Sequence, residues 1–186
     1  MKILMFILWG FITTAASAQQ IFTSEEYGFS IEEPAGWVSD LNINHYFNLD
    51  KNDGKNLLTF YKYKRGPIKD INPMINVSVE YSGLNDERFF KRYLKEFNWN
   101  ESYYITHELV KKPEVIVING NKAIMGTVHF KYNSHGTKKT TFRKRIYYIP
   151  HEKYLFKIIF IDDYTTEDNT PLFNRIASTL KIMSRL

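Results

Sequence analysis

The sequence predicts an α+β protein, specifically an α/β/α sandwich in which a mostly antiparallel sheet carries helices on both faces. Two segments, Asn85 to Trp99 and Thr170 to Leu180, repeat apolar residues with the period of an amphipathic helix. Several other segments are rich in aromatic and β-branched residues and are separated by turn signals, so antiparallel pairing is the default. One of them, Tyr154 to Ile161, is apolar except at Lys157, which predicts a central strand buried on both faces.

The first strands are expected in the N-terminal part of the chain. The segment Tyr27 to Ile31 alternates in the manner of a strand, and Pro34-Ala35-Gly36 ends it before Trp37 returns to an apolar environment. The segments Asn56 to Lys64 and Pro73 to Tyr81 are rich in aromatic and β-branched residues, so we expect two further strands there.

The segment Asn85 to Trp99 predicts the first helix. Its apolar residues share one face of a helix, while charged residues cover the other face. The apolar residues are Phe89, Phe90, Tyr93, Leu94 and Phe97. Asn85 is a suitable N-cap, because its side chain can accept a hydrogen bond from a free backbone N–H of the first turn.

Strand-like runs follow this helix. The runs Ile105 to Val110 and Val115 to Ile118 are separated by Lys111-Lys112-Pro113, and Asn119-Gly120 then predicts a tight hairpin turn. The next run, Lys122 to Tyr132, is expected to form the returning strand of that hairpin.

The run Thr140 to Ile149 is the next expected strand. Its alternation places Phe142, Ile146 and Tyr148 inward and Arg143 and Arg145 outward. Because the two arginines are expected to be exposed, reversing their charges should leave the stability of the fold nearly unchanged.

The last predicted element is the helix from Thr170 to Leu180. Thr170 is expected to be its N-cap, with Pro171 at the first helical position, where the missing N–H costs nothing. Glu167 and Asp168 precede the cap, where negative charge suits the helix dipole.

Residues 1–18 have the pattern of a secretory signal peptide. Lys2 gives a positive start, an apolar run extends from Ile3 to Ile12, and Ala16-Ser17-Ala18 fits the A-x-A cleavage pattern. A membrane anchor is the competing interpretation, but a spanning helix needs about 20 apolar residues and polar threonines follow too early. We therefore expect cleavage near Ala18, a single domain over residues 19–186 without a transmembrane segment, and a periplasmic or secreted product.

Composition and charge limit the possible functions. The chain has no cysteine, which excludes a disulfide framework, a thiolate metal site, a cysteine nucleophile and a lipid-anchor cysteine. The formal net charge of +5 is far from the concentrated basic stripe of a nucleic-acid binder, so no nucleic-acid partner is expected. Six basic residues and no acid occur from Lys131 to Arg145, whereas four acids and no base occur from Asp162 to Asp168. We therefore expect separate basic and acidic regions on the molecule.

Three local signatures occur in order along the chain: YGFSIEEPAGW from Tyr27 to Trp37, INGNKA from Ile118 to Ala123, and FKIIF…FNRIASTLKI from Phe156 to Ile182. In order and spacing they resemble the PsbP-like family, also called the Mog-type α/β/α sandwich, in an exported bacterial member. The resemblance implies a compact, usually non-catalytic module that binds other proteins. No functional motif of a family member matches this chain residue by residue, and a fold alone does not define a function.

Motifs of catalytic, nucleotide-binding and metal sites are absent from the sequence. It contains no nucleophile elbow, P-loop, dinucleotide fingerprint or zinc-binding H-E-x-x-H helix. His129 is expected to be an exposed residue on the outer face of its strand, with a role as ligand or base as the alternative. The acids Asp162, Asp163, Glu167 and Asp168 could bind calcium, but helix capping and solvation is the favoured interpretation. No cofactor is expected.

The hairpin from Lys131 to Arg145, joined by Tyr147, is the best candidate interaction surface. Its arginines and tyrosine share one strand face, a combination that can bind phosphate, acidic polysaccharide or an acidic protein patch. The alternative is a solvated strand near a sheet edge, where lysines discourage edge-to-edge pairing. The candidate residues are Lys131, Lys138, Lys139, Arg143, Lys144, Arg145 and Tyr147.

Three functional hypotheses follow. The leading one is an exported, non-enzymatic, PsbP-like module that binds a protein partner in the cell envelope. The second is a binder of a small or polymeric anionic ligand through the basic hairpin. The third is a hydrolase or metal-dependent enzyme, which requires His and Asp residues from distant segments to meet in one cleft.

Overall fold

The structure is a computed structural model that describes residues 20–40, 55–64, 72–82, 86–96, 105–134 and 138–183. Within these ranges, the side chains of residues 86, 95–96, 105–109, 131–134 and 138–140 are not described. The expected signal peptide and the predicted N-cap Asn85 lie outside the described residues. None of the described helices is long and apolar enough to cross a membrane.

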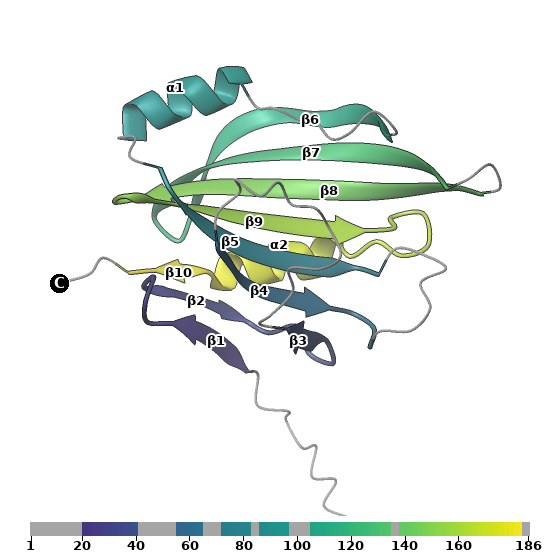
Figure 1. The fold of residues 1–186 in the computed structure, drawn as a ribbon, viewed down its shortest axis with the longest axis horizontal. Helices are drawn as coiled ribbons and strands as arrows, with labels where there is room; N and C mark the ends of the chain where they lie inside the picture. The colour runs from purple at the N-terminus through teal and green to yellow at the C-terminus, as the bar shows by residue number, and fades with distance from the viewer. Residues whose placement is uncertain are drawn as a thin grey trace, which may run out of the picture.

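The described strands form a main sheet of seven strands in the order β3-β4-β5-β9-β8-β7-β6 (Figure 1). Every neighbouring pair in this sheet is antiparallel, which confirms the predicted α+β class. The strands are β3 (Val38–Asp40), β4 (Lys55–Tyr61), β5 (Met74–Tyr81), β6 (Ile105–Ile118), β7 (Asn121–Ser134), β8 (Lys138–His151) and β9 (Tyr154–Asp162).

Strand β9 is the central strand, as its sequence predicts. It pairs with β5 on one side and β8 on the other. Its apolar side chains alternate between two faces that are both buried: Phe156, Ile158 and Phe160 on one, and Leu155, Ile159 and Ile161 on the other. A strand with water on one face would show polar residues at every second position, and β9 does not.

Helix α2 (Thr170–Thr179) packs on the first of these faces, and Figure 1 shows it behind the sheet. Its buried residues are Phe173, Ile176 and Ala177. The Phe173 ring lies 4.9 Å from that of Phe160 and 6.5 Å from that of Trp37. The largest apolar cluster of the described residues therefore lies between α2 and the sheet.

Helix α1 (Asp86–Glu96) packs through Phe89, which is 0% exposed and contacts Ile124 and Leu155. Phe89 also stacks on Tyr93, with 4.4 Å between ring centroids. Burial, followed by the nearby Glu80 carboxylate, raises the pKa of Tyr93 to about 12. The predicted first helix is therefore present. Its contacts with the main sheet are with β6, β7 and β8, and the expected covering of both faces of the sheet by helices stays a prediction.

A second, three-stranded sheet was not predicted. It consists of β1 (Ile21–Ser24), β2 (Phe29–Glu32) and β10 (Lys181–Ile182), in the order β1-β2-β10. Strand β2 corresponds to the predicted strand from Tyr27 to Ile31. Gly28, with a φ of 63°, allows the turn before β2 to approach the residue after β10, because a Cβ there would lie 2.6 Å from the carbonyl oxygen of Met183.

The two strands predicted on either side of Lys111-Lys112-Pro113 are a single strand, β6. In place of a break, its pairing with β7 shifts between Leu109 and Lys111 and again between Lys111 and Glu114. Each bulge adds one residue to β6, so the second bulge restores the alternation of faces that the first one interrupts. The predicted turn at Asn119-Gly120 is confirmed, with positive φ angles of 45° and 80° that match a type I′ hairpin.

Candidate functional site

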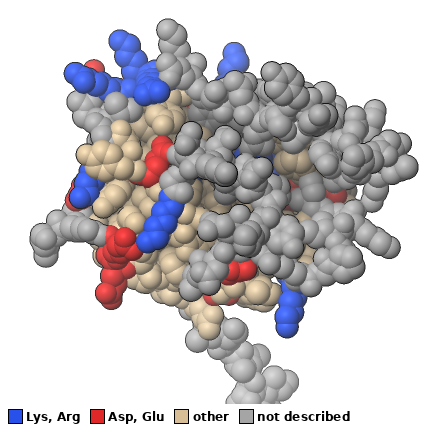
Figure 2. Space-filling view, viewed as in Figure 1, with Lys and Arg blue, Asp and Glu red and all other residues tan. Residues whose placement is uncertain are grey.

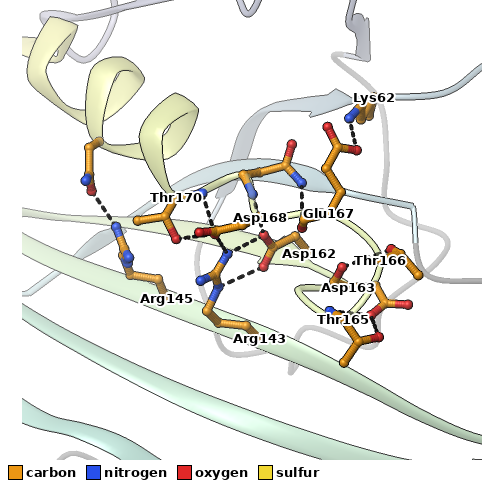
Figure 3. A network of polar contacts seen from close by, with 12 residues as sticks. Lys62, Arg143, Arg145, Asp162, Asp163, Thr165, Thr166, Glu167, Asp168 and Thr170 are labelled. Carbon is orange, nitrogen blue, oxygen red and sulfur yellow. Dashed lines mark hydrogen bonds and ion pairs between the residues drawn. The ribbon is translucent and has the colours of Figure 1, made fainter.

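A buried ion pair between β8 and β9 is the centre of a polar network (Figure 3). The register of the two strands places Arg143 directly opposite Asp162. Nε of Arg143 donates to Oδ1 of Asp162 at 2.9 Å, and Nη2 donates to Oδ2 at 2.5 Å. The side chain of Asp162 is 0% exposed and that of Arg143 is 12% exposed. This two-bond geometry holds the arginine inside the protein rather than on its surface.

Asp168 extends the network to the start of α2. Its Oδ1 accepts from Nη2 of Arg143 at 2.8 Å, from the hydroxyl of Thr170 at 2.6 Å and from the backbone N–H of Thr170 at 3.0 Å. The hydrogen bond from the Thr170 hydroxyl, followed by that from Arg143, holds the pKa of Asp168 well below its ordinary value. Burial acts to lower the pKa of Arg143, but its bonds to Asp162 and Asp168 outweigh burial and raise it.

The N-terminus of α2 differs from the prediction by one residue. Thr170 is the first helical residue, and the N-cap is Asn169, which makes no side-chain capping bond. The capping acceptor is instead the Asp168 carboxylate, which binds the N–H of Thr170. Pro171, which was expected at the first helical position, is therefore the second helical residue.

The loop between β9 and α2 is held by its own side chains. Oδ1 of Asp163 accepts from the N–H of Thr165 at 3.0 Å, and the backbone oxygen of Asp163 accepts from the N–H of Thr166 at 3.1 Å. Glu167 forms an ion pair with Lys62, which follows β4. The first contacts fold the start of the loop on itself, and the ion pair joins its later part to the residue after β4.

The ring of Tyr164 lies beside both Arg143 and His129. Tyr164 of the loop stacks on His129 of β7, with 4.0 Å between ring centroids. The guanidinium carbon of Arg143 lies 5.7 Å from the centroid of the Tyr164 ring. His129 is therefore partly covered by the loop, whereas the sequence predicted an exposed residue.

The structure places the basic hairpin in the interior of the sheet. Strand β8 lies between β7 and β9, and β7 adjoins the edge strand β6, so neither arm of the hairpin is itself an edge strand. Tyr147 is 4% exposed and packs on Phe160, and Lys144 is 5% exposed over the ring of Phe130. Nη1 of Arg145 donates to Oδ1 of Asn174 in α2 at 2.6 Å.

The expectation that Arg143 and Arg145 point outward to solvent is therefore corrected. The first turns of α2 and the preceding loop cover the β8 face that carries both arginines. Lys131, Lys138 and Lys139 lie at the far end of the β7–β8 hairpin, opposite Thr141, Ser134 and Asn133, and their side chains are outside those that the structure describes. A binding role for the hairpin stays a prediction. Its described side chains do not support that role, because they make contacts inside the protein.

The acidic segment also differs from its predicted role. Asp162 and Asp163 are 0% and 9% exposed, so solvation is wrong for these two residues, whereas capping is correct for Asp168. Among the described residues, no group of three or more His, Asp or Glu side chains is arranged to hold a metal ion. Calcium binding therefore has no support in the described part of the chain.

The ion pair was missed although the sequence contains a signal for it. Strands β8 and β9 are joined by a two-residue turn, Glu152 and Lys153, in which Glu152 has a φ of 53°. A two-residue turn fixes the register of a hairpin. Continuing that register from the turn places Arg143 opposite Asp162. Once the turn is recognised, the basic and acidic segments are expected to face each other.

Exposed apolar side chains occur instead on β6, at the edge of the main sheet. Val110, Val115 and Val117 are 51%, 48% and 67% exposed. Ile116 and Ile118 alternate with them and pack into the core. We use the name β6 edge for the segment Val110–Ile118.

Basic side chains gather near this edge. Figure 2 shows a group of Lys and Arg side chains at the corner where Figure 1 places α1. The exposed basic residues of α1 are Arg88, Lys91 and Arg92, and those of the β6 edge and the start of β7 are Lys111, Lys112 and Lys122. Exposed basic side chains therefore occur both on α1 and along the β6 edge and the start of β7.

Comparisons with known proteins address the fold. No family model and no curated protein matches the chain. The structure is similar to that of cyanobacterial PsbP (CyanoP) from Synechocystis sp. PCC 6803, with a TM-score of 0.59 and 13% identity over 95% of this chain and 99% of that one. The chain has a PsbP-like, Mog-type fold. The family resemblance of the three sequence signatures is thereby confirmed at the level of the fold.

Two other solved structures are similar to the PsbP-like chain. A protein from Bacteroides thetaiotaomicron has a TM-score of 0.56 and 14% identity, over 90% of this chain and 49% of that one. The Ran-binding protein Mog1p of Saccharomyces cerevisiae has a TM-score of 0.44 and 13% identity, over 88% of this chain and 95% of that one. At these identities the likeness concerns the fold alone.

Proposed function

We propose that this PsbP-like chain is an exported, non-enzymatic module that binds a protein partner in the cell envelope. One observation carries the proposal: the polar groups best suited to chemistry are bound to one another. Arg143 binds Asp162 and Asp168, and the backbone N–H groups of Asn169 and Thr170 bind the same two carboxylates. Such a network stabilises a fold, whereas catalysis requires groups that are open to a substrate.

The fold supports the same function. In the PsbP-like family, to which the sequence signatures are similar, compact non-catalytic modules bind other proteins. The anionic-ligand hypothesis has less support, because its central residues are used inside the protein. Arg143 is paired with two carboxylates, and Lys144 and Tyr147 are buried.

Export is tested on the protein expressed in its natural host. If residues 1–18 are a signal peptide, the intact mass should correspond to a chain that begins at Gln19, recovered without a lipid from the soluble periplasmic or extracellular fraction. Recovery with Met1 intact from the membrane fraction would contradict this part of the proposal.

Partner binding is tested by cross-linking in intact cells. The full chain carries a C-terminal affinity tag, and cross-linked products are purified and identified by mass spectrometry. We expect one envelope protein in a fixed ratio to the tagged chain, with the same protein recovered at different cross-linker concentrations. Recovery of the chain alone at every concentration would contradict a binding module.

A further inference from the structure

Within the described part of the chain, the β6 edge has a strand neighbour on one side. Among the described strands β6 pairs only with β7, so the backbone N–H and C=O groups on its other side have no strand partner there. Such an edge is a template for another extended chain. From Val115 to Ile118 the pairing with β7 runs without interruption, which leaves this part of the strand regular.

Proteins usually guard an edge of this kind, and β6 is guarded in one part. Lys111, Lys112 and Pro113, together with the two bulges, protect the middle of the strand. The segment Val115–Ile118 carries no lysine, proline or bulge, and two of its valines are exposed. The opposite edge of the same sheet, β3, is only three residues long. The unguarded segment is therefore a specific feature of β6.

The charge around this segment determines which occupant fits. From residue 110 to residue 122 the chain has three lysines and one acid, and that acid, Glu114, is paired with Lys111 at 2.6 Å. The exposed Lys91 belongs to α1, whose Phe89 packs on Ile124, and Ile124 is the register partner of Val115. The charged side chains described around this edge are therefore mostly basic. A second copy of the chain would bring like charges together, whereas an acidic segment would neutralise them.

We propose that an extended segment of a partner protein, rich in acidic and β-branched residues, adds as a strand along Val115–Ile118. Backbone hydrogen bonds to β6 supply affinity, and the exposed Val115 and Val117 contact apolar side chains of the added strand. Lys112 and Lys122 attract its acidic residues. The inference rests on the proposed function and assigns it a surface and a class of partner.

The test uses a random decapeptide display library selected on the immobilised full chain. We expect enriched peptides that combine acidic with β-branched residues and lack proline. Synthetic copies labelled with fluorescein should bind in fluorescence polarisation measurements, and methylation of alternate backbone nitrogens should weaken binding by about tenfold or more, since strand addition depends on backbone donors. On saturation with peptide, amide hydrogen exchange should slow in β6.

Two substitutions provide a matched pair. Val117→Glu should weaken peptide binding by about tenfold or more, because it adds a negative charge at the contact. Val38→Glu makes the same change at a 42% exposed valine of β3, on the other edge of the sheet, and should leave binding unchanged. Lys112→Glu with Lys122→Glu should weaken binding and reduce its dependence on salt.

Several results would overturn the inference. These are a selection that enriches no peptide, enriched peptides that bind Val117→Glu as tightly as the wild type, or a chain that is dimeric in light scattering and becomes monomeric in Val117→Glu. If the envelope partner cross-links equally well to the wild type and to Val117→Glu, the binding module stands and the β6 edge is not its surface. If no partner cross-links to the wild type, the proposed function itself fails.

Discussion

Removing the arginine of the buried ion pair is the sharpest test of the network. Arg143→Ala leaves the Asp162 carboxylate, 0% exposed, with the backbone N–H of Asn169 as its remaining described donor, at 3.2 Å. Breaking a buried pair by removing one partner costs about 3–5 kcal/mol, because an uncompensated charge remains in the interior. The 12% exposure of Arg143 lets some water reach the site. We therefore expect a loss of about 3 kcal/mol, a large part of the stability of an ordinary domain.

The assay is equilibrium unfolding in urea, followed by circular dichroism. The matched control is Arg175→Ala, which removes a 3.7 Å pair with Glu32 in which the side chains are 45% and 29% exposed. This loss should be about 0–1 kcal/mol. Combining Arg143→Met with Asp162→Asn removes both charges and should cost clearly less than the two single changes added together. A loss below about 1 kcal/mol for Arg143→Ala would refute the interpretation of a buried pair.

Three further predictions follow from the packing and the network. Phe160→Ala should reduce the unfolding free energy by about 3–5 kcal/mol, because its ring is 0% exposed in the centre of the sheet; a loss below about 1 kcal/mol in the same assay would contradict the central position of β9. Asp168→Asn should be less stable than the wild type at neutral pH, and the difference in unfolding free energy should shrink as pH falls below about 4. The reason is that a carboxyl whose pKa is lowered in the folded state contributes stability above its ordinary pKa and loses it on acidification, so a difference that grows in acid would contradict this sign. Asn119→Ala should reduce the unfolding free energy by about 1–2 kcal/mol in thermal or urea unfolding, because the Asn119 amide donates to the backbone oxygens of Ser178 and Leu180 and a φ of 45° disfavours alanine. An unchanged unfolding free energy would mean that this turn does not hold the end of α2.

The sequence was sufficient where a local pattern decides the structure. The central position of β9 could be predicted because its apolar residues occupy both alternating sets of positions. The Asn119-Gly120 turn could be predicted because few residue pairs adopt two successive positive φ angles. Helix α1 follows from the helical spacing of Phe89, Phe90 and Tyr93.

Elements held by long-range contacts could not be predicted in the same way. Strand β10 has two residues, and its partner β2 lies near the other end of the described chain. No hydrophobic period marks a strand of that length. The bulges of β6 have the same origin, because pairing with β7 carries the strand through Lys111-Lys112-Pro113, a segment with the local pattern of a break.

The candidate site was misjudged because alternation along one strand does not say what covers its second face. The pattern of β8 correctly places Phe142 and Ile146 inward. It gives no sign that α2 and the loop before it cover the opposite face, where Arg143 and Arg145 lie. The loss of about 3 kcal/mol predicted for Arg143→Ala therefore replaces the expectation that charge changes at these arginines leave stability unchanged.

The pairing inside the protein also changes where an external charge contact is expected. The charge of Arg143 is offset by the carboxylates of Asp162 and Asp168, and Arg145 is bound to Asn174 of α2. Of the exposed lysines at and beside the β6 edge, Lys111 is paired with Glu114, whereas Lys112 and Lys122 are exposed. A partner that binds by charge should therefore respond to reversal of Lys112 and Lys122, while reversal of Arg143 should act first on folding. Measuring unfolding and binding on the same set of variants separates the two effects.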